Sequence, residues 1–574
     1  MSKPKFIMGV HASYSQHRDR PKNDMVLVKE KQLLEDGTIK ENLRFFENYQ
    51  RDFYVTKPRY RDHKSKKEWE KISRCSRIKT NQACLIPSIA KALNIRKNGL
   101  RRMARNPSLY GADINVTTLI LHKYIETYGD SELMPTVAVM DYEWDVDTGK
   151  PSIGTYMYEN KVYLTIRKDK IANCGYSTTA FINKLQEDFK KEVIPLVDEF
   201  YERTNADGKL INKNVARIYP ELHVEVVDLD LDVVRKLFKH THTTMPDYLT
   251  FWNGISDLEI IMALCEEYMV DPADFMNDPS VPKEYRNCRL DKGLTETIDA
   301  NGNKKPKSPS EQWHVLSNMA SWQFIDMMCC YHTNRAHKPN LPSYSFEFIM
   351  RLELMMKKLR LVPKLNALAE SDMGTWHKEM SNNHILEYAL YATMDVIEPM
   401  ILEAKSYEIR AQAYSNLTYH PIGDFKKNPR KLCNAQHFSF LKSGHIVGTT
   451  SDQMREDVDN HIYQGDNWII TLNSSYHDQL ETPALADSDI PTLFSPSNDD
   501  GDLTSSYPSN SRLLNISKTT TVTELIKVKG IPEEIMREVG LNLSSNGDNS
   551  IDFCYRVLGL PHLQDVLVSW DNSK

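Results

Sequence analysis

A short apolar run is the feature that most constrains what this chain can fold into. Residues Leu133 to Met140 contain several β-branched side chains, and Asp141, Tyr142 and Glu143 follow them directly. An apolar run of this length is typical of a strand buried in the centre of a sheet. Asp141 and Glu143 are two positions apart, so on a strand both carboxylates point to the same face. The sequence therefore predicts two acids side by side at the end of a buried strand.

The segments after this run predict the rest of a sheet. Two more strands are expected at 154–158 and 162–167, joined by a tight turn at 159–161, and an amphipathic helix is expected from Thr179 to Arg203. Three antiparallel strands followed by helices and further strands are the opening of a ribonuclease-H-like fold. We therefore expect an α/β (α+β) multidomain protein, with an N-terminal domain at 1–131, a ribonuclease-H-like domain at 132–407 and a third region at 408–574.

Length and composition agree with a large globular protein. The 574 residues are enough for about three domains, and 40% hydrophobic and 26% charged residues are ordinary for a soluble protein. No apolar run approaches the roughly 18 residues needed to span a bilayer, and the first residues lack the apolar core of a signal peptide. The nine cysteines form no CxxC pair, which indicates reduced thiols rather than disulfides or a zinc ribbon. A cytoplasmic location and no membrane partner are expected.

Charge is distributed unevenly although the net charge is only −6. Lysine and arginine outnumber acids between Lys57 and Lys79, where Tyr60 and Trp69 are interleaved, and the stretch from Arg96 to Arg105 contains no acid. Basic surfaces attract phosphate backbones, and aromatic rings can stack on unpaired bases. Residues 1–131 are therefore expected to combine a strand-like opening with a helical, basic segment that binds DNA. A solvated helix face is the alternative explanation for each basic stretch.

Further acids complete a possible metal site. Tyr391 and Asp395 are four residues apart in a helix expected from Asn383 to Lys405, so they share one helix face. Asp257 follows Trp252 to Gly254 at the start of an apolar helix. Together with Asp141 and Glu143, these acids could hold two Mg²⁺ or Mn²⁺ ions about 3.5 to 4 Å apart, the arrangement used for phosphodiester hydrolysis. The predicted catalytic residues are Asp141, Glu143, Asp257, Tyr391 and Asp395, with the four acids as metal ligands.

The order of these segments resembles the three exonuclease motifs of family B DNA polymerases of the T-even phage type. The first motif corresponds to Asp141 to Glu143, the second to Trp252 and Asn253 with Asp257, and the third to Tyr391 to Asp395. The middle motif is one residue shorter than usual and lacks the aromatic residue before the aspartate, so Glu259 remains an alternative to Asp257. The resemblance implies a 3′–5′ proofreading exonuclease on primer-template and single-stranded DNA. The turn at Asn301 and Gly302 is similar in position to the hairpin that helps to separate a mispaired primer end.

A second resemblance lies near the end of the sequence. Residues Asp502 to Ser509 resemble the first palm motif of the same polymerases, with Ser506 in place of leucine, and Arg512 to Ser517 resembles its continuation. By this resemblance, Asp502 and the Leu503 carbonyl would hold the polymerase metals, and Ser505, Ser506 and Tyr507 would contact the deoxynucleoside triphosphate.

The later motifs of these polymerases are not found after Asp502 in this sequence, so the chain is expected to carry only part of a polymerase. Residues 408–574 would return to the N-terminal domain and form a partial palm. The chain would then be one subunit of a split viral replicative polymerase in the host cytoplasm. A second chain would supply the fingers, the remaining palm and the thumb, with a sliding clamp as a further possible partner. A stand-alone exonuclease and a non-catalytic DNA-binding scaffold are the alternatives.

Overall fold

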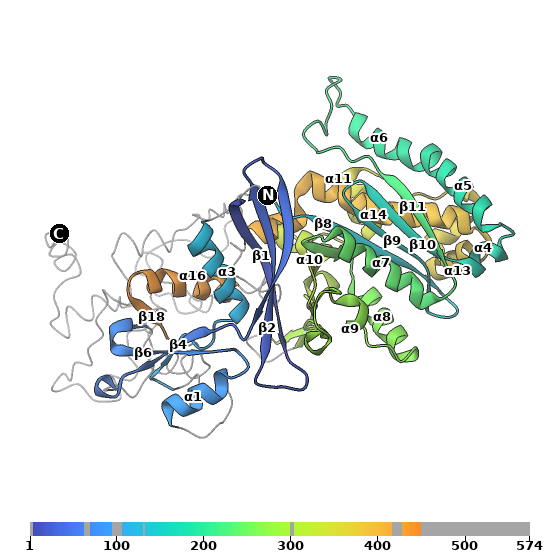
Figure 1. Cartoon of the computed structure of the whole chain (residues 1–574). Helices are drawn as coiled ribbons and strands as arrows, with labels where there is room; N and C mark the ends of the chain where they lie inside the picture. Colours follow the sequence, from blue (N-terminus) through green and yellow to red (C-terminus); the bar gives the residue numbers. More distant parts are fainter. Residues whose placement is uncertain are drawn as a thin grey trace, which may run out of the picture. The chain divides into compact units, whose positions relative to one another are not determined.

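The computed structural model describes residues 4–61, 69–94, 106–129, 133–298, 304–356, 358–415 and 428–448. All of them belong to one compact unit that spans residues 1–450. This unit is a mixed α/β structure with a six-stranded sheet and many helices, so the predicted fold class is confirmed at this level (Figure 1). The domain boundaries at 131/132 and 407/408 stay predictions.

The six-stranded sheet has the order β11-β10-β9-β8-β12-β17. Its antiparallel part is β8 (Val137–Asp145), β9 (Lys150–Tyr158) and β10 (Lys161–Arg167). The other three strands run parallel to their neighbours and are β11 (Glu221–Val227), β12 (Tyr248–Phe251) and β17 (Gln323–Asp326). The predicted meander of three antiparallel strands is therefore confirmed.

The ends of these strands differ from the prediction. Strand β8 begins at Val137 rather than Leu133, because Pro135 has no backbone N–H to donate to a ladder. It then continues to Asp145, so Asp141 and Glu143 lie within the strand and not after its end. The turn between β9 and β10 is tight as predicted, with Glu159 in the left-handed region at φ 54°.

Successive side chains of β8 point alternately into two hydrophobic cores. Val137 and Val139 pack in the cluster that contains α14 (Ile385–Ser406), whereas Ala138, Met140 and Tyr142 pack in the cluster that contains α7 (Asp230–Thr244) and α8 (Ile255–Glu267). Successive residues of a strand point to opposite faces. Asp141 and Glu143 therefore face α14.

The remaining helices around this sheet surround the same two cores. The helix predicted from Thr179 to Arg203 is present as α5 (Thr178–Asp188), a π-helical turn at Phe189–Val193 and α6 (Ile194–Glu202). The others are α4 (Lys168–Asn173), α9 (Ala273–Met276), α10 (Met327–Asn334), α11 (Phe346–Leu354), α12 (Asn366–Ser371), α13 (Met373–Asn383) and α15 (Glu408–Ser415).

Smaller sheets come from the N-terminal part of the chain. One contains β1 (Pro4–Gln16), β2 (Asp24–Leu34) and β3 (Ile39–Glu47), with α3 (Val116–Tyr128) packed on β1. Another has the order β6 (Cys75–Thr80), β4 (Arg51–Thr56) and β7 (Leu109–Tyr110), and α1 (Leu85–Leu93) belongs to the same core. Strand β18 (His445–Val447), which follows α16 (Asn428–Lys442), pairs with β5 (Trp69–Lys71).

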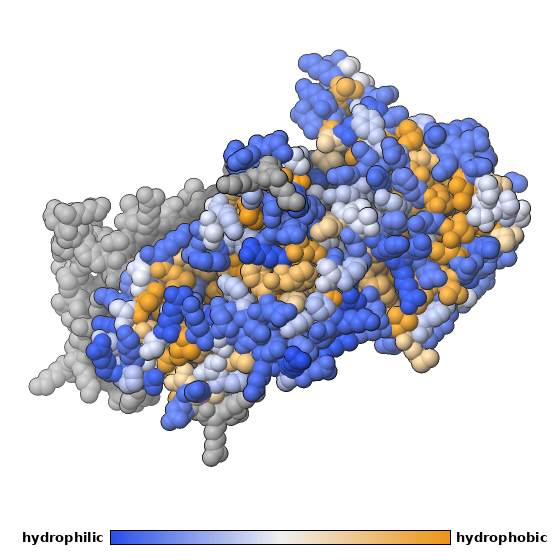
Figure 2. Space-filling view, viewed as in Figure 1, coloured by the Kyte–Doolittle hydropathy of each residue, from blue (hydrophilic) through white to orange (hydrophobic). Residues whose placement is uncertain are grey.

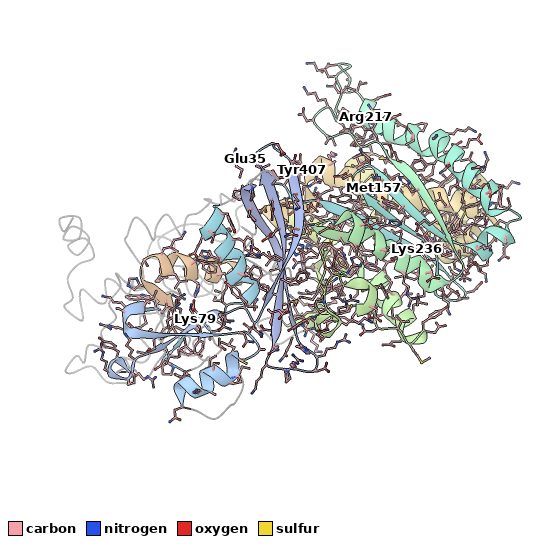
Figure 3. The ribbon with its side chains drawn as sticks, in the orientation of Figure 1. Glu35, Lys79, Met157, Arg217, Lys236 and Tyr407 are labelled. Atoms are coloured by element: carbon pink, nitrogen blue, oxygen red, sulfur yellow. The ribbon has the colours of Figure 1, made fainter. Side chains whose placement is uncertain are left out.

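The first basic stretch contains no α-helix where it is described, only short 3-10 turns at Pro58–Tyr60 and Ile72–Arg74. Residues 69–79 form β5, which pairs with β18, a short 3-10 turn, and β6, which pairs with β4. Its lysine and arginine side chains are largely exposed, including Lys79, which is labelled in Figure 3. Arg59 and Arg74 lie over the ring of Tyr60, at 4.7 and 5.5 Å from its centroid. The stretch from Arg96 to Arg105 lies outside the described residues.

A hairpin projects from the region after α8. Strands β14 (Glu296–Ile298) and β15 (Lys304–Pro306) are antiparallel, as a hairpin requires, and the predicted turn at Asn301 and Gly302 lies outside the described residues. Nearby, β13 (Cys288–Asp291) pairs with β16 (Val315–Asn318). On the visible face in Figure 2, hydrophilic residues predominate and hydrophobic residues form separate patches. Within the described ranges, no helix is both long and apolar enough to cross a membrane.

Candidate functional site

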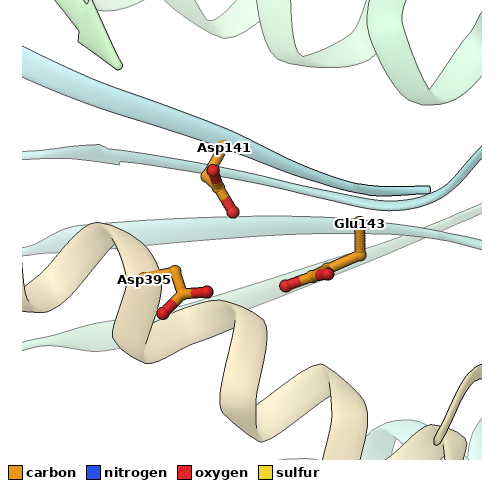
Figure 4. A group of neighbouring side chains, drawn as sticks. All are labelled: Asp141, Glu143 and Asp395. Atoms are coloured by element: carbon orange, nitrogen blue, oxygen red, sulfur yellow. The ribbon is translucent and has the colours of Figure 1, made fainter. Parts of the chain in front are cut away.

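Three carboxylates from two elements meet between the sheet and α14. Asp141 and Glu143 come from β8 and Asp395 comes from α14, and ligand oxygens of all three lie within 4.8 Å of one another. The three side chains point toward a common space (Figure 4). Because α14 packs against β8 and β9, the helix face that carries Asp395 is held over the strand face that carries the other two acids. We call Asp141, Glu143 and Asp395 the acidic cluster.

Burial and mutual repulsion disfavour negative charge in the acidic cluster. The pKa of the Asp141 carboxyl is raised well above its ordinary value, first by burial and then by Asp257, Asp395 and Glu143. Burial also raises the pKa of Asp395 to about 6, although the nearby Lys358 ammonium opposes this shift. A divalent cation would replace this repulsion by attraction. Oxygen-only ligands of this kind are those that Mg²⁺ and Mn²⁺ prefer, so the residues present fit the predicted ions.

Tyr391 and Lys358 border the acidic cluster on one side. Tyr391 lies one helical turn before Asp395, as the spacing predicts, and Lys358 donates to the Tyr391 hydroxyl and to Asp395 Oδ2, the latter at 3.3 Å. Burial by itself lowers the pKa of the Lys358 ammonium. The negative charges of Asp395, Glu143 and other acids together have the larger effect, so the pKa of Lys358 is raised. Lys358 lies in an irregular segment after α11, where no periodicity in the sequence marks it.

Asp257 is buried near the acidic cluster but does not join it. It lies in the first turn of α8, and Trp144 Nε1 donates to its Oδ1 at 3.1 Å. Burial raises the pKa of Asp257 to about 7 against the opposing effect of this hydrogen bond, and its charge in turn raises the pKa of Asp141. Glu259, the alternative, is exposed and forms an ion pair with Lys292. Asp257 is therefore the better candidate for the middle acid.

The turn before Asp257 is fixed by another acid, Asp326. This residue, at the end of β17, accepts from the backbone N–H groups of Asn253 at 3.3 Å and Gly254 at 2.9 Å. Asn253 has a φ of 61°, an uncommon value that these two bonds help to hold. Asp326 thereby sets where α8 begins and where Asp257 is placed.

Two residues that the sequence analysis missed hold Glu143. Tyr388 on α14 donates to Glu143 Oε2 at 2.5 Å, and His377 on α13 lies 2.7 Å from the Tyr388 hydroxyl. Tyr388 is three residues before Tyr391, so helical spacing could have placed it on the same face. His377 is on a separate helix, and nothing in the sequence around it connects it with Glu143.

A further missed residue is Glu398, three residues after Asp395. Its side chain is fully buried, and neither carboxyl oxygen has a hydrogen-bond partner among the described residues. Burial raises the pKa of Glu398 well above its ordinary value, with a further contribution from Asp395. Glu398 is therefore expected to be a neutral carboxyl group beside the acidic cluster.

A pocket with three aromatic rings in its lining is connected to these residues through Lys358. Its volume is about 400 Å³, and its lining includes Trp252, Asn253, Tyr344 and Phe346. The Lys358 ammonium lies 4.9 Å from the centroid of the Phe346 ring. Lys358 thus connects the pocket to the acidic cluster, and the rings offer flat faces of the kind on which nucleobases stack.

The predicted polymerase residues Asp502, Leu503, Ser505, Ser506 and Tyr507 lie outside the described residues. No model of a known protein family matches this chain, and no curated protein matches it either. The assignment of function therefore depends on the geometry above and on the sequence motifs.

Proposed function

We propose that the region around the acidic cluster is a ribonuclease-H-like 3′–5′ exonuclease that uses Mg²⁺ or Mn²⁺ to remove nucleotides from DNA. The observation that carries this proposal is the convergence of Asp141, Glu143 and Asp395 within 4.8 Å. Acids from distant parts of the sequence meet beside Tyr391, Lys358 and an aromatic pocket. The acids can bind cations, and the pocket can hold the end of a nucleic acid.

The strand order supports the ribonuclease-H-like assignment. Strands β8, β9 and β10 form an antiparallel meander, and β12 and β17 continue the sheet parallel to β8 on its other side. The first strand of the meander carries two of the acids, and the 22-residue helix α14 carries the third. This is the arrangement that the sequence motifs imply.

The surroundings of each residue in the site indicate its role. When bound, the divalent cations would polarise the scissile phosphate and lower the pKa of water. The acidic cluster would hold them, with Asp257 as a nearby fourth acid. Burial raises the pKa of Tyr391 well above its ordinary value, so this phenol stays a neutral hydroxyl that orients a neighbour rather than a base that removes a proton. Lys358 supplies a positive charge for the DNA phosphate, and the pocket holds the terminal base.

Digestion of DNA tests this proposal directly. The isolated chain would be incubated in Mg²⁺ with a single strand and with a 3′-recessed duplex, each labelled at its 5′ end. A ladder of labelled strands that shortens stepwise from full length is expected, because removal of nucleotides one at a time from the 3′ end keeps the 5′ label on every intermediate product. The Asp141→Ala/Glu143→Ala variant should give no ladder, and Asp257→Asn should be strongly impaired.

Glu259→Ala provides the matched control, because this exposed acid pairs with Lys292 away from the acidic cluster. It should digest DNA like the wild type. Digestion that survives in the double variant would sink the proposal, as would binding of DNA without any digestion by the wild type, which would favour a scaffold.

The motif at Asp502 to Ser509 supports an additional role in DNA synthesis. If the chain takes part in DNA synthesis, Asp502→Ala should abolish templated incorporation of deoxynucleotides and leave 3′ digestion intact. Loss of digestion in Asp502→Ala would contradict the separation of the two sites.

A further inference from the structure

Glu143 is held by a short chain of hydrogen bonds that reaches it from two helices. The Tyr388 hydroxyl donates to Glu143 Oε2 at 2.5 Å, and His377 Nδ1 lies 2.7 Å from the Tyr388 hydroxyl oxygen and 3.4 Å from Glu143 Oε2. The ring of Trp376 packs edge-on against both, with centroids 4.9 Å from His377 and 6.0 Å from Tyr388. Both partners of Glu143 are therefore fixed by packing.

The direction of the hydrogen bonds follows from the proton count. The Tyr388 hydroxyl has one proton, which it gives to the Glu143 carboxylate, so its oxygen must accept from His377. His377 therefore carries a proton on Nδ1. The resulting chain runs from His377 Nδ1–H to the Tyr388 hydroxyl and from there to Glu143 Oε2. Each donor orients the next group toward the acidic cluster.

This chain leaves one oxygen of Glu143 for a cation. Tyr388 and His377 both lie against Oε2, and Oε1 takes part in neither contact. A short hydrogen bond to an ionised carboxylate is stronger than one between neutral groups, so it can hold the carboxylate in one orientation. Ligands that are already oriented lose less entropy when an ion binds.

We propose that Tyr388 and His377 are positioning residues that set the affinity of the acidic cluster for its divalent cations by orienting Glu143. The proposal rests on the proposed metal-dependent function of this site. Tyr388 acts directly on Glu143, and His377 acts through Tyr388. Neither residue is a catalytic residue, because neither touches the reacting atoms.

The test measures Mn²⁺ binding to the full chain by calorimetry, together with digestion over a range of Mn²⁺ concentrations. Tyr388→Phe removes only the hydroxyl and should weaken Mn²⁺ binding by about 10- to 100-fold, the range found for residues that orient metal ligands. Digestion should recover toward the wild-type rate as Mn²⁺ approaches saturation, because the ligands themselves remain. A structural defect would not be rescued by the ion in this way.

Tyr331→Phe is the matched control. Its hydroxyl donates to Glu353 Oε1 at 2.6 Å, a similar pair that does not involve the acidic cluster. This variant should bind Mn²⁺ like the wild type. At position 377, Asn can still donate near the place of Nδ1 and should retain most of the affinity, whereas Leu cannot donate and should lose affinity in the same direction as Tyr388→Phe.

The outcomes separate this inference from the proposed function. Unchanged Mn²⁺ affinity in Tyr388→Phe, or an equal loss in Tyr331→Phe, would overturn the positioning role while wild-type digestion still supported the nuclease. Loss of digestion in Tyr388→Phe that saturating Mn²⁺ does not restore would overturn it too. Absence of both Mn²⁺ binding and digestion in the wild type would instead remove the proposed function itself.

Discussion

Burial and neighbouring acids act together on the carboxyl group of Asp141. Its pKa is raised well above the ordinary value in the folded protein, so the folded state binds a proton more tightly than the unfolded chain does. The free energy of unfolding of the metal-free protein must then fall as pH rises from the unfolded pKa through the folded pKa. In the absence of a cation, Asp141 is expected to lower stability at alkaline pH.

Asp141→Asn should therefore raise the melting temperature of the metal-free protein by a few degrees at pH 8. The gain should shrink toward zero at pH 4, where the wild-type carboxyl is protonated and resembles an amide. Thermal melts of both proteins in EDTA at the two pH values measure this difference. A gain that is the same at both pH values, or a loss at pH 8, would contradict the assigned repulsion.

Lys358→Met should strengthen Mn²⁺ binding several-fold, opposite in sign to Tyr388→Phe. The Lys358 ammonium interacts with Asp395 at 3.3 Å and competes with a cation for the same negative charge. Calorimetric titration of both variants with Mn²⁺ shows whether each one binds the ion more tightly or more weakly than the wild type. Digestion by Lys358→Met should fall even with Mn²⁺ saturated, because the positive charge for the DNA phosphate is gone. Weaker Mn²⁺ binding in this variant would show that Lys358 orders the site rather than competes for it.

Residues with regular spacing on one element could be predicted from the sequence. Asp141 and Glu143 are two positions apart on a strand, so they share one face of the sheet. Tyr391 and Asp395 are four positions apart on a helix, so they share one helix face. Lys358 and His377 reach the site through packing of distant segments, which no local pattern encodes. Asp257 was predicted as a further acid at the start of an apolar helix and lies in the first turn of α8, but its hydrogen bond to Trp144 depends on the tertiary fold.

Helix α14 is the element that organises the site. Tyr388, Tyr391, Asp395 and Glu398 recur at three- and four-residue spacing, so they form one stripe along the face toward the sheet. The central strand was predicted from a short apolar run with β-branched residues, and this helix from the helical spacing of its polar residues in a long segment. Strand ends and the basic stretch were predicted less well, since pairing with β4 made Cys75–Thr80 a strand despite its many charges.

Deletion of the β14–β15 hairpin tests a role for one element in substrate choice. If it separates the primer end from the template, replacing 296–306 by a short glycine linker should lower digestion of a 3′-recessed duplex more than digestion of a single strand. Initial rates on both substrates give the ratio. Shortening the exposed turn at 205–208, within the connection between α6 and β11, is the control and should leave the ratio unchanged. Equal losses on both substrates would count against strand separation.

At the scale of the whole described unit, a buried ion pair and a hydrogen bond connect the N-terminal sheet to the central sheet. Lys31 on β2 forms an ion pair with Asp247, the residue before β12, and both side chains are almost fully buried. Lys29 donates to Glu41 at 2.6 Å and to the backbone carbonyl of Met245 at 2.7 Å. These contacts fix the entry of β12, the strand that leads to the turn before Asp257. No sequence pattern predicts such pairs, because their members are far apart in the chain.

Lys31→Met should therefore destabilise the protein by about 3 to 5 kcal/mol, because it leaves the Asp247 charge buried without its partner. The backbone N–H of Thr136, which donates to Asp247 Oδ2 at 2.7 Å, cannot compensate for a lost ammonium. The midpoint of urea unfolding measures the effect. Adding Asp247→Asn to Lys31→Met removes the unpaired charge and should recover much of the loss. A double variant no more stable than Lys31→Met would indicate that packing of the lysine stem, and not the ion pair, joins the two sheets.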